Sequence, residues 1–535
     1  MKKIVSSQPQ KEENKYSNRK MKNKNKLYLF LAAMLVCGSI SAQEHYTFNY
    51  TDFEYNMNVV AEIQINGVEQ TSNNIELGAF VNGTVRGSQR ITVSEGYYRA
   101  WIQVYFNDND DVSELTLPVS FEIYDHGTST SYTNYTASKT VKIRLNNWGT
   151  AVDPVILDFV TEQTYTKTIT PYSATNGGWY LISSPIGNVA PENVTNMTAN
   201  NFDLYRFNQS ASLEWENYKA EGEHYHFNLE AGKGYLYANS GNVTLSFTGY
   251  PYNGDGQVTL TKDNDPTFAG WNLVGNPFPQ NAYITKSFYI INPTGRAAVI
   301  AGTGNQVEAM EGVFVVAAEE GEVMTFTTTA PDKTNRQLVI NLTNNNSRGN
   351  AIDRAIVRFD NSEELPKFQL FEDDTKLYIP QNNKDYAIVN AEAQGEIPVN
   401  FKPAENGTYT LSISTEGVTM NYFHLIDNFT GNDIDLLETP SYTFDANNCN
   451  YASRFKLVFA TSNTSDDQFA FISNGQIILN GVNGNTTVQL FDVTGRMLSS
   501  TNGANRISVE NMAAGVYVIR LVNGNDVKTQ KVVVK

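Results

Sequence analysis

The sequence predicts an all-β protein made of several antiparallel β-sandwich domains. Aromatic residues form 12% of the chain, led by 30 Tyr and 28 Phe, and such side chains favour pleated sheets. Apolar and polar residues alternate with period two along many stretches, and no convincing amphipathic helix follows residue 44. Dipeptides such as Asn82-Gly83 and Asn406-Gly407 recur between these stretches and are typical of tight hairpin turns.

Three stretches illustrate the alternation. Residues 61–66, 243–248 and 409–413 each place apolar side chains at every second position, with polar side chains between them. This pattern predicts strands that bury one face and expose the other.

The length of the chain indicates several domains. A single hydrophobic core stops growing at roughly 250–300 residues, and this chain has 535. We therefore expect about three to five domains.

The charge of the chain excludes some partners. Nine of the 39 basic residues and two of the 56 acidic residues lie in the first 42 positions, so the remainder has a net charge of −24. An acidic surface repels phosphate backbones, so we expect no nucleic-acid partner and no anionic lipid partner. Cations and neutral glycans remain compatible with it.

The first 42 residues have the pattern of a signal peptide. A basic region at residues 20–26 precedes an apolar run at 27–37, and the small residues Ser41 and Ala42 end the segment. We expect cleavage after Ala42. The apolar run is too short for a membrane anchor, and the residues before Cys37 do not suit a lipoprotein.

Cysteine usage excludes an intramolecular disulfide in the processed chain. The sequence holds two cysteines, and removal of the signal peptide leaves only Cys449. No segment after the signal peptide is apolar enough to span a bilayer.

The middle of the chain contains an internal repeat. Three pairs of segments match in the same order, each pair joining a first copy to a second copy. The pairs are 178–185 with 270–277, 230–237 with 308–315, and 245–248 with 324–327. The repeat predicts one duplicated β domain over residues 165–332, with two GWxLxxxP motifs.

These observations divide the chain into five segments. They are a signal peptide at 1–42, a β-sandwich module at 44–160, the duplicated β domain at 165–332, a second β-sandwich module at 335–461, and a C-terminal domain at 467–535. A short polar stretch at 461–467 is typical of a linker and precedes the last domain.

The C-terminal segment resembles a known family. Three motifs occur in order, VQLFDVTGR at 488–496, GVYVIRL at 515–521 and KVVVK at 531–535. Together they resemble the type IX secretion system C-terminal sorting domain of Gram-negative bacteria. The proline-rich opening common in that family is replaced here by residues 469–475.

The resemblance implies an immunoglobulin-like fold and a destination outside the cell. In the family, the domain directs a folded cargo through the periplasm and across the outer membrane by the type IX secretion machinery. It is then usually removed, and the cargo is released or attached to surface lipopolysaccharide. The resemblance assigns the sorting motif to Asp492, Gly495, Arg496, Gly515, Val516, Tyr517, Arg520, Lys531 and Lys535.

The sequence offers weak candidates for a metal site. His224 and His226 would share one face of a strand, as zinc ligands can, but no third ligand follows at motif spacing. Asp108 and Asp110 lie in an acidic loop that leaves calcium binding open, although solvated loop acids are the favoured interpretation. We otherwise expect no cofactor.

Catalytic motifs are missing from the sequence. There is no G-x-S-x-G, no H-E-x-x-H and no phosphate-binding glycine loop with lysine. Cys449 has no local catalytic context.

Aromatic side chains crowd the first copy of the repeat, where flat rings with polar edges suit stacking on sugars. The residues that could bind a ligand in this way are Trp215, Tyr218, Tyr225, Tyr235 and Tyr237. Many of them must belong to the core, because a sandwich buries its aromatic side chains first.

Two functional hypotheses remain at the sequence level. The preferred one is a non-catalytic secreted or cell-surface protein, adhesin-like, that binds a host glycan or a host matrix protein. The alternative is a secreted hydrolase, a peptidase or glycosidase, whose site is not visible as a motif.

Overall fold

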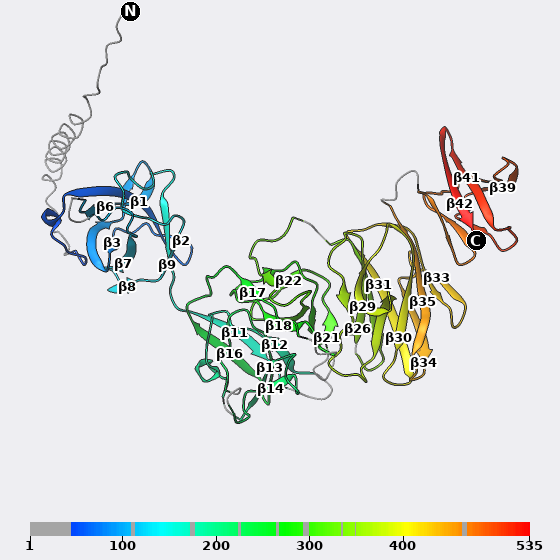
Figure 1. Cartoon of the computed structure of the whole chain (residues 1–535), viewed down its shortest axis with the longest axis horizontal. Helices are drawn as coiled ribbons and strands as arrows, with labels where there is room; N and C mark the ends of the chain where they lie inside the picture. Colours follow the sequence, from blue (N-terminus) through cyan, green and yellow to red (C-terminus); the bar gives the residue numbers. More distant parts are fainter. Residues whose placement is uncertain are drawn as a thin grey trace, which may run out of the picture. The chain divides into compact units, whose positions relative to one another are not determined.

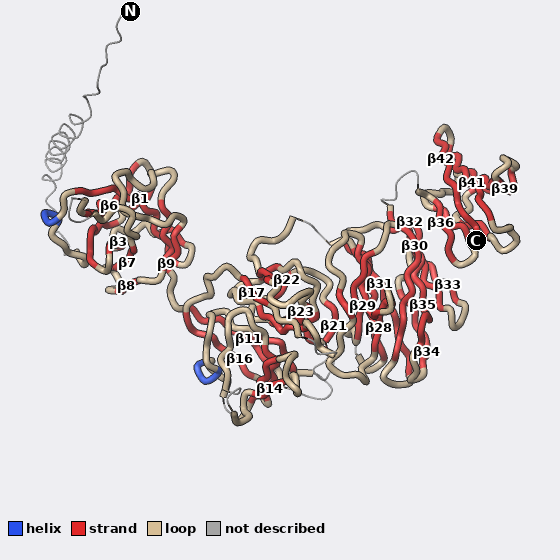
Figure 2. The backbone as a smooth tube through the Cα atoms, viewed as in Figure 1, coloured by secondary structure: helices blue, strands red, loops and turns tan. Residues whose placement is uncertain are grey.

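The computed structural model describes residues 44–535, apart from 109–112, 172–176, 199, 223–225, 264–266, 293–298, 333–334, 348 and 463–467. The predicted signal peptide lies outside the described residues. Figures 1 and 2 show that the described part is built from strands and connecting loops. Its only helical elements are two short 3-10 turns, η1 (Tyr50–Asp52) and η2 (Pro191–Asn193). The predicted all-β class is therefore confirmed. The chain divides into two compact units, residues 1–161 and 162–535.

The first unit is a sandwich of two sheets. The first sheet contains β5 (Thr92–Ser94), β6 (Tyr97–Phe106), β1 (Tyr55–Ile65), β10 (Val155–Phe159) and β9 (Tyr135–Ala137) in this order, with β2 (Val68–Glu69) paired to β1. The second contains β4 (Thr84–Arg90), β3 (Ile75–Val81), β7 (Ser120–Asp125) and β8 (Thr130–Tyr132). Both sheets contribute to one core, in which Ala61 and Ile63 of β1 are buried as the alternation predicts. Most pairs are antiparallel, but β1 and β10 run parallel.

Residues 162–332 form two four-stranded sheets with the same strand order. The first is β12 (Trp179–Ile182), β15 (Tyr235–Asn239), β13 (Phe202–Phe207) and β14 (Trp215–Asn217). The second is β18 (Trp271–Gly275), β23 (Gly312–Val316), β20 (Tyr289–Ile291) and β21 (Val299–Ala301). Three two-stranded sheets complete the region: β11 (Gln163–Ile169) with β16 (Val243–Gly249), β17 (Gln257–Thr259) with β24 (Val323–Thr325), and β19 (Ala282–Tyr283) with β22 (Gln306–Val307).

The two four-stranded sheets meet where the chain approaches itself closely. The backbone of Lys233 forms a bridge with Val274, and the hydroxyl of Ser183 donates to the carbonyl of Asn276 at 2.8 Å. A Cβ added at Gly275 would lie 2.4 Å from the carbonyl oxygen of Lys233. Only glycine fits this crossing without a shift of the backbone.

Residues 335–461 form one eleven-stranded sheet. Its order is β33 (Asn432–Asp435), β32 (Met420–Asp427), β35 (Tyr451–Thr461), β30 (Gln394–Lys402), β28 (Lys376–Gln381), β29 (Lys384–Asn390), β26 (Asp353–Arg358), β25 (Gln337–Asn344), β31 (Gly407–Glu416) and β34 (Ser441–Ala446), with β27 (Leu365–Pro366) paired to β29. Leu338 and Val357 from one part of this order share a core with Leu425 and Leu457 from the other. The sheet thus folds over itself and encloses its core as a sandwich does.

Residues 162–332 and the eleven-stranded sheet also share a core. Trp271 stacks on Phe368 with ring centroids 4.1 Å apart, and Tyr289 and Phe314 pack against the same ring. The hydroxyl of Tyr289 accepts from the backbone of Phe368 at 3.0 Å and donates to the carbonyl of Pro366 at 3.1 Å. The predicted boundary near residue 333 therefore separates sheets but not hydrophobic cores.

Candidate functional site

The C-terminal segment folds as a small sandwich of two sheets. One sheet contains β36 (Ala470–Ser473), β37 (Gln476–Leu479) and β40 (Arg506–Ser508); the other contains β39 (Met497–Asn502), β38 (Thr487–Asp492), β41 (Gly515–Asn523) and β42 (Asp526–Val534). Ile477 from the first sheet shares a core with Val488 and Ile519 from the second. This is the fold that the resemblance to a sorting domain implies.

Two polar contacts join distant parts of this sandwich. The amide of Gln530 donates to the carbonyl of Ala470 and accepts from its backbone N–H, both at 2.6 Å, as a neighbouring strand would. The hydroxyl of Tyr517 donates to the carbonyl of Ala513 at 2.7 Å, and its ring is buried. A tyrosine bonded to backbone a few residues upstream is a feature of immunoglobulin-like sandwiches.

Asp492 organises the turn between β38 and β39. Its Oδ1 accepts from the backbone of Thr494 and of Arg496 at 3.0 Å each, and from the hydroxyl of Thr494 at 2.6 Å. The hydrogen bond from the Thr494 hydroxyl and those from Arg496 hold the pKa of Asp492 below its ordinary value. Gly495 has φ of +84°, a conformation that suits glycine. These contacts explain the residue types of the turn.

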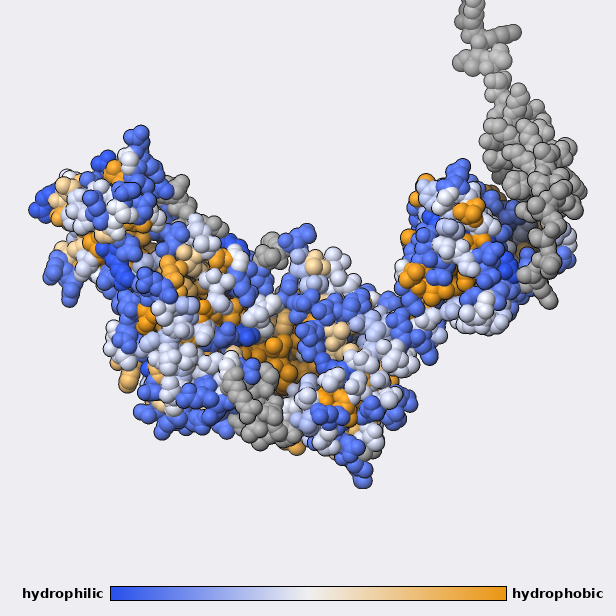
Figure 3. Space-filling view, turned by 180° about the vertical axis from the view of Figure 1, so that it is seen from behind, coloured by the Kyte–Doolittle hydropathy of each residue, from blue (hydrophilic) through white to orange (hydrophobic). Residues whose placement is uncertain are grey.

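The remaining motif residues lie on β41 and β42. Val516 is paired with Val533, and Val518 with Lys531, so these side chains share the outer face of the sheet. Val516, Arg520, Lys531, Val533 and Lys535 are exposed on this domain, while Gly515 is half-buried. The outer face therefore presents apolar and basic side chains together. The face of the molecule in Figure 3 is mostly hydrophilic, with separate apolar areas.

The sorting segment contacts the eleven-stranded sheet through Arg506. Its guanidinium lies 2.7 Å from Asp433 Oδ2 and 3.2 Å from Nε2 of His424, which is buried. Because a guanidinium only donates, Nε2 of His424 accepts and its Nδ1–H donates to Asp433 at 2.7 Å. Burial raises the pKa of Asp433, but hydrogen bonds from Arg506 and His424 outweigh it, so this pKa is lowered.

An apolar contact lies beside this ion pair. Ile478 packs in one cluster with Tyr422, Ile426 and Val458 of the eleven-stranded sheet. The hydroxyl of Ser473 also donates to the carboxylate of Glu396 at 2.5 Å. Sequence reasoning missed this interface, because nothing in the separate segments signals that they meet.

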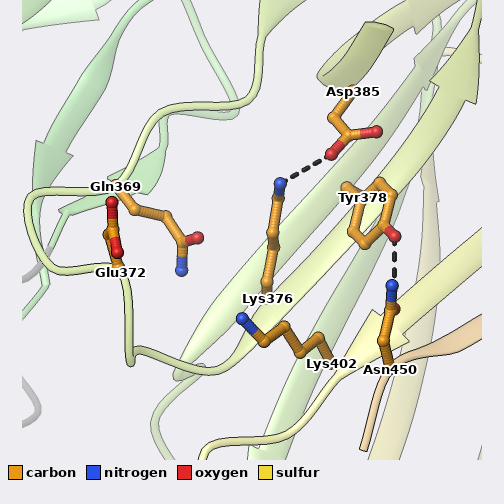
Figure 4. Close-up of a pocket in the computed structure, with 7 residues that line it drawn as sticks. All are labelled: Gln369, Glu372, Lys376, Tyr378, Asp385, Lys402 and Asn450. Carbon is orange, nitrogen blue, oxygen red and sulfur yellow. Dashed lines mark hydrogen bonds and ion pairs between the residues drawn. The ribbon is translucent and has the colours of Figure 1, made fainter. Parts of the chain in front are cut away.

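A polar pocket of about 340 Å³ lies on the eleven-stranded sheet. Figure 4 shows the side chains of Lys376 and Lys402 pointing into the space that Gln369 and Glu372 border. The lining residues are Gln369, Glu372, Lys376, Tyr378, Asp385, Lys402 and Asn450.

The two lysines of the pocket lie directly opposite each other on β28 and β30. Lys376 donates to Asp385 at 2.6 Å, and its ammonium lies 4.6 Å from the centre of the Tyr378 ring. The Tyr378 hydroxyl donates to the amide oxygen of Asn450 at 3.3 Å. Sequence reasoning missed this pocket as well, since only strand pairing brings residues 376 and 402 together.

The aromatic residues predicted to stack on a ligand lie largely in the core, and this corrects the prediction for Tyr235 and Tyr237. Tyr235 and Tyr237 are 1% and 0% exposed, because β15 lies between β12 and β13 and faces hydrophobic cores on both sides. Trp215 is half-buried against Phe207 and Phe314. Tyr218 is also half-buried and donates to Glu192 at 3.2 Å. Tyr225 lies outside the described residues.

Of the weak metal candidates, the structure describes His226 and Asp108. His226 is exposed and packs edge-on against Tyr218, and Asp108 accepts from the hydroxyl of Ser113 at 2.7 Å. His224 and Asp110 lie outside the described residues. Within the part of the chain that the structure describes, no group of three or more His, Cys, Asp or Glu side chains could hold a metal ion.

Two further features of the described residues concern the membrane and the thiol. No helix among them is long and apolar enough to cross a bilayer. Cys449 is exposed and free.

Comparisons with known proteins bear on the C-terminal segment. Residues 472–535 match the family model described as "Secretion system C-terminal sorting domain". Among the curated proteins, none matches the chain. An alignment with the solved structure "Crystal structure of Dscam1 isoform 4.4, N-terminal four Ig domains" covers 90% of this chain and 100% of that chain at 10% identity. Its TM-score of 0.09 is too low to establish a shared fold. The chain therefore carries a type IX secretion sorting domain at its C-terminus, which supports its being a cargo protein of that system and implies secretion to the cell surface or the extracellular space.

Proposed function

We propose that the exported protein is a non-catalytic, adhesin-like protein that binds a host glycan or a host matrix protein. The observation that carries the proposal is the sorting domain at residues 472–535, which places the cargo outside the cell, where such ligands occur.

The modules before the sorting domain support a binding role. The polar pocket on the eleven-stranded sheet offers charged and amide groups for a polar ligand. The half-buried Trp215 is compatible with stacking on a sugar. The equal strand order of the two four-stranded sheets supports a duplicated domain, an arrangement that offers two related surfaces.

Further parts of the proposal concern processing and ions. Residues 1–42 act as a cleaved signal peptide, and the sorting domain is removed after export, with the cargo released or attached to lipopolysaccharide. The loop that contains Asp108 is the candidate calcium site. Mass spectrometry of the cell-surface and medium fractions, which gives both termini of the mature chain, tests the processing.

The binding role is tested with the chain from residue 43 to residue 535. It is applied to an array of glycans and to immobilised matrix proteins, and the same preparation is assayed for peptidase and glycosidase turnover. Saturable binding without turnover is the expected result. Turnover that is lost on substitution of His226 by Ala, with the fold retained, would replace the proposal by the hydrolase hypothesis.

A further inference from the structure

We propose that the polar pocket on the eleven-stranded sheet binds the carboxylate of an acidic sugar, a hexuronic acid unit, beside Lys402. The inference rests on the proposed binding function and names the ligand class of one site. It is carried by the juxtaposition of two lysines, by the charges around them and by the size and polarity of the cavity.

Lys376 and Lys402 are directly opposite partners of antiparallel strands, and like charges in this position are destabilising. Asp385 accepts from Lys376 at 2.6 Å, so the charge of that ammonium is balanced within the protein. The Lys402 side chain is exposed and has no ion pair or hydrogen bond with any described residue. A bound anion would balance this second charge.

The exposed Glu372 borders the same cavity, and Asp385 lies on its other side (Figure 4). Because Asp385 is paired with Lys376, the free charges at the cavity are the ammonium of Lys402 and the carboxylate of Glu372. A single negative charge beside Lys402 suits this arrangement better than a doubly charged phosphate, which Glu372 would repel more strongly. The ligand is therefore a monoanion, such as a carboxylate.

A carboxylate such as Glu372 only accepts hydrogen bonds, so it binds hydroxyl donors, and the amides of Gln369 and Asn450 both donate and accept. The only aromatic ring in the lining belongs to Tyr378, which is 6% exposed and has the Lys376 ammonium over its face. The cavity thus offers little apolar surface for a lipid or an aromatic ligand, but it suits a ligand rich in hydroxyls.

The cavity of about 340 Å³ lies at the lower end of the range of roughly 300–1,000 Å³ that is usual for small-molecule sites. Such a space holds one sugar unit, with its neighbours in a chain extending into solvent. A single carboxylate, several hydroxyls and this size together describe a hexuronic acid.

The experiment measures binding to the chain from residue 43 to residue 535 by ligand-observed NMR. The probes are D-glucuronate, its methyl ester, D-glucose and inorganic phosphate. We expect glucuronate to bind, and the ester, glucose and phosphate to bind at least about fivefold more weakly. K402Q should weaken glucuronate binding about tenfold, the factor that corresponds to one charge-assisted hydrogen bond.

A matched variant controls for the loss of one positive charge. Lys384 is an exposed lysine on β29 that does not line the cavity, so K384Q should bind glucuronate as the unmodified chain does. The inference is overturned if K402Q and K384Q bind equally, or if the ester or phosphate binds as tightly as glucuronate. Binding of neutral glycans or matrix proteins without any response to glucuronate rejects this inference and keeps the proposed function. No binding to any glycan or protein rejects both.

Discussion

Arg506 of the sorting domain lies 2.7 Å from Asp433 of the preceding module, and the pair links two parts of the chain that are 73 residues apart. The same guanidinium donates to buried His424, and Ile478 covers an apolar cluster beside it. The sorting domain therefore has a specific polar and apolar contact with its cargo.

The first prediction concerns this ion pair. Both side chains are about one-third exposed, so solvent screens them and the coupling should be only about 0.5–1 kcal/mol. A double-mutant cycle with R506A and D433A, followed by urea unfolding, measures it. If the effects of the two variants simply add, the ion pair does not contribute to the contact.

The second prediction concerns the close approach at Gly275. G275A places a Cβ 2.4 Å from the Lys233 carbonyl oxygen, so the backbone must shift, at a cost of about 1–3 kcal/mol. Thermal unfolding should show a lowered Tm. The control is G407A, because a Cβ at Gly407 meets no atom within 4 Å. Equal Tm values for the two variants would contradict the crossing described here.

The third prediction concerns the buried ion pair between Lys367 and Asp353. Their side chains are 1% and 4% exposed and lie 2.6 Å apart, and burial lowers the pKa of Lys367. K367M leaves the Asp353 carboxylate buried without its partner, so the free energy of unfolding should fall by about 3–5 kcal/mol. Urea unfolding measures this change. K456M, which breaks an exposed pair with Glu396, should cost less than about 1 kcal/mol. A similar loss of unfolding free energy in K367M and K456M would show that burial of the ion pair does not determine the loss.

The fourth prediction concerns pH and Glu76 in the first unit. This carboxylate is fully buried, and burial raises its pKa, but hydrogen bonds from the backbone of His45 and Tyr46 and the side chains of Ser88 and His126 outweigh this effect. The folded pKa is therefore below the unfolded value of about 4.3. The ionised Glu76 carboxylate therefore stabilises the folded state fully above the unfolded pKa, and this stabilisation is lost as the pH falls through the folded pKa.

Hydrogen exchange in the full chain measures this loss. Protection of the His45 and Tyr46 amides, corrected for the intrinsic rate, should fall as the pH drops below about 4.3, because both amides donate to Glu76. In E76Q the protection should be lower at neutral pH and should no longer depend on pH in this range. A pH profile that is the same in both proteins would exclude Glu76 as its cause.

The sequence predicted the strands and the sorting domain well, for local reasons. Ala61 and Ile63 alternate with polar residues on β1 and are buried. The turn at Asp492 is formed by consecutive residues, so its motif is visible in the sequence. The predicted stacking role of Tyr235 was wrong, because alternation cannot show that a strand is covered on both faces. The pocket at Lys402 could not be predicted, since its partner in the sheet is 26 positions away and only strand pairing brings them together.

The central claim is that the sorting domain exports this protein. It is tested by deleting residues 469–535 in the native bacterium and measuring the protein in the periplasm, on the cell surface and in the medium with an antibody against the first unit. G407A in the intact chain serves as a folded control. We predict that the truncated protein stays in the periplasm while the control is exported. Unchanged amounts of truncated protein outside the cell would contradict the account.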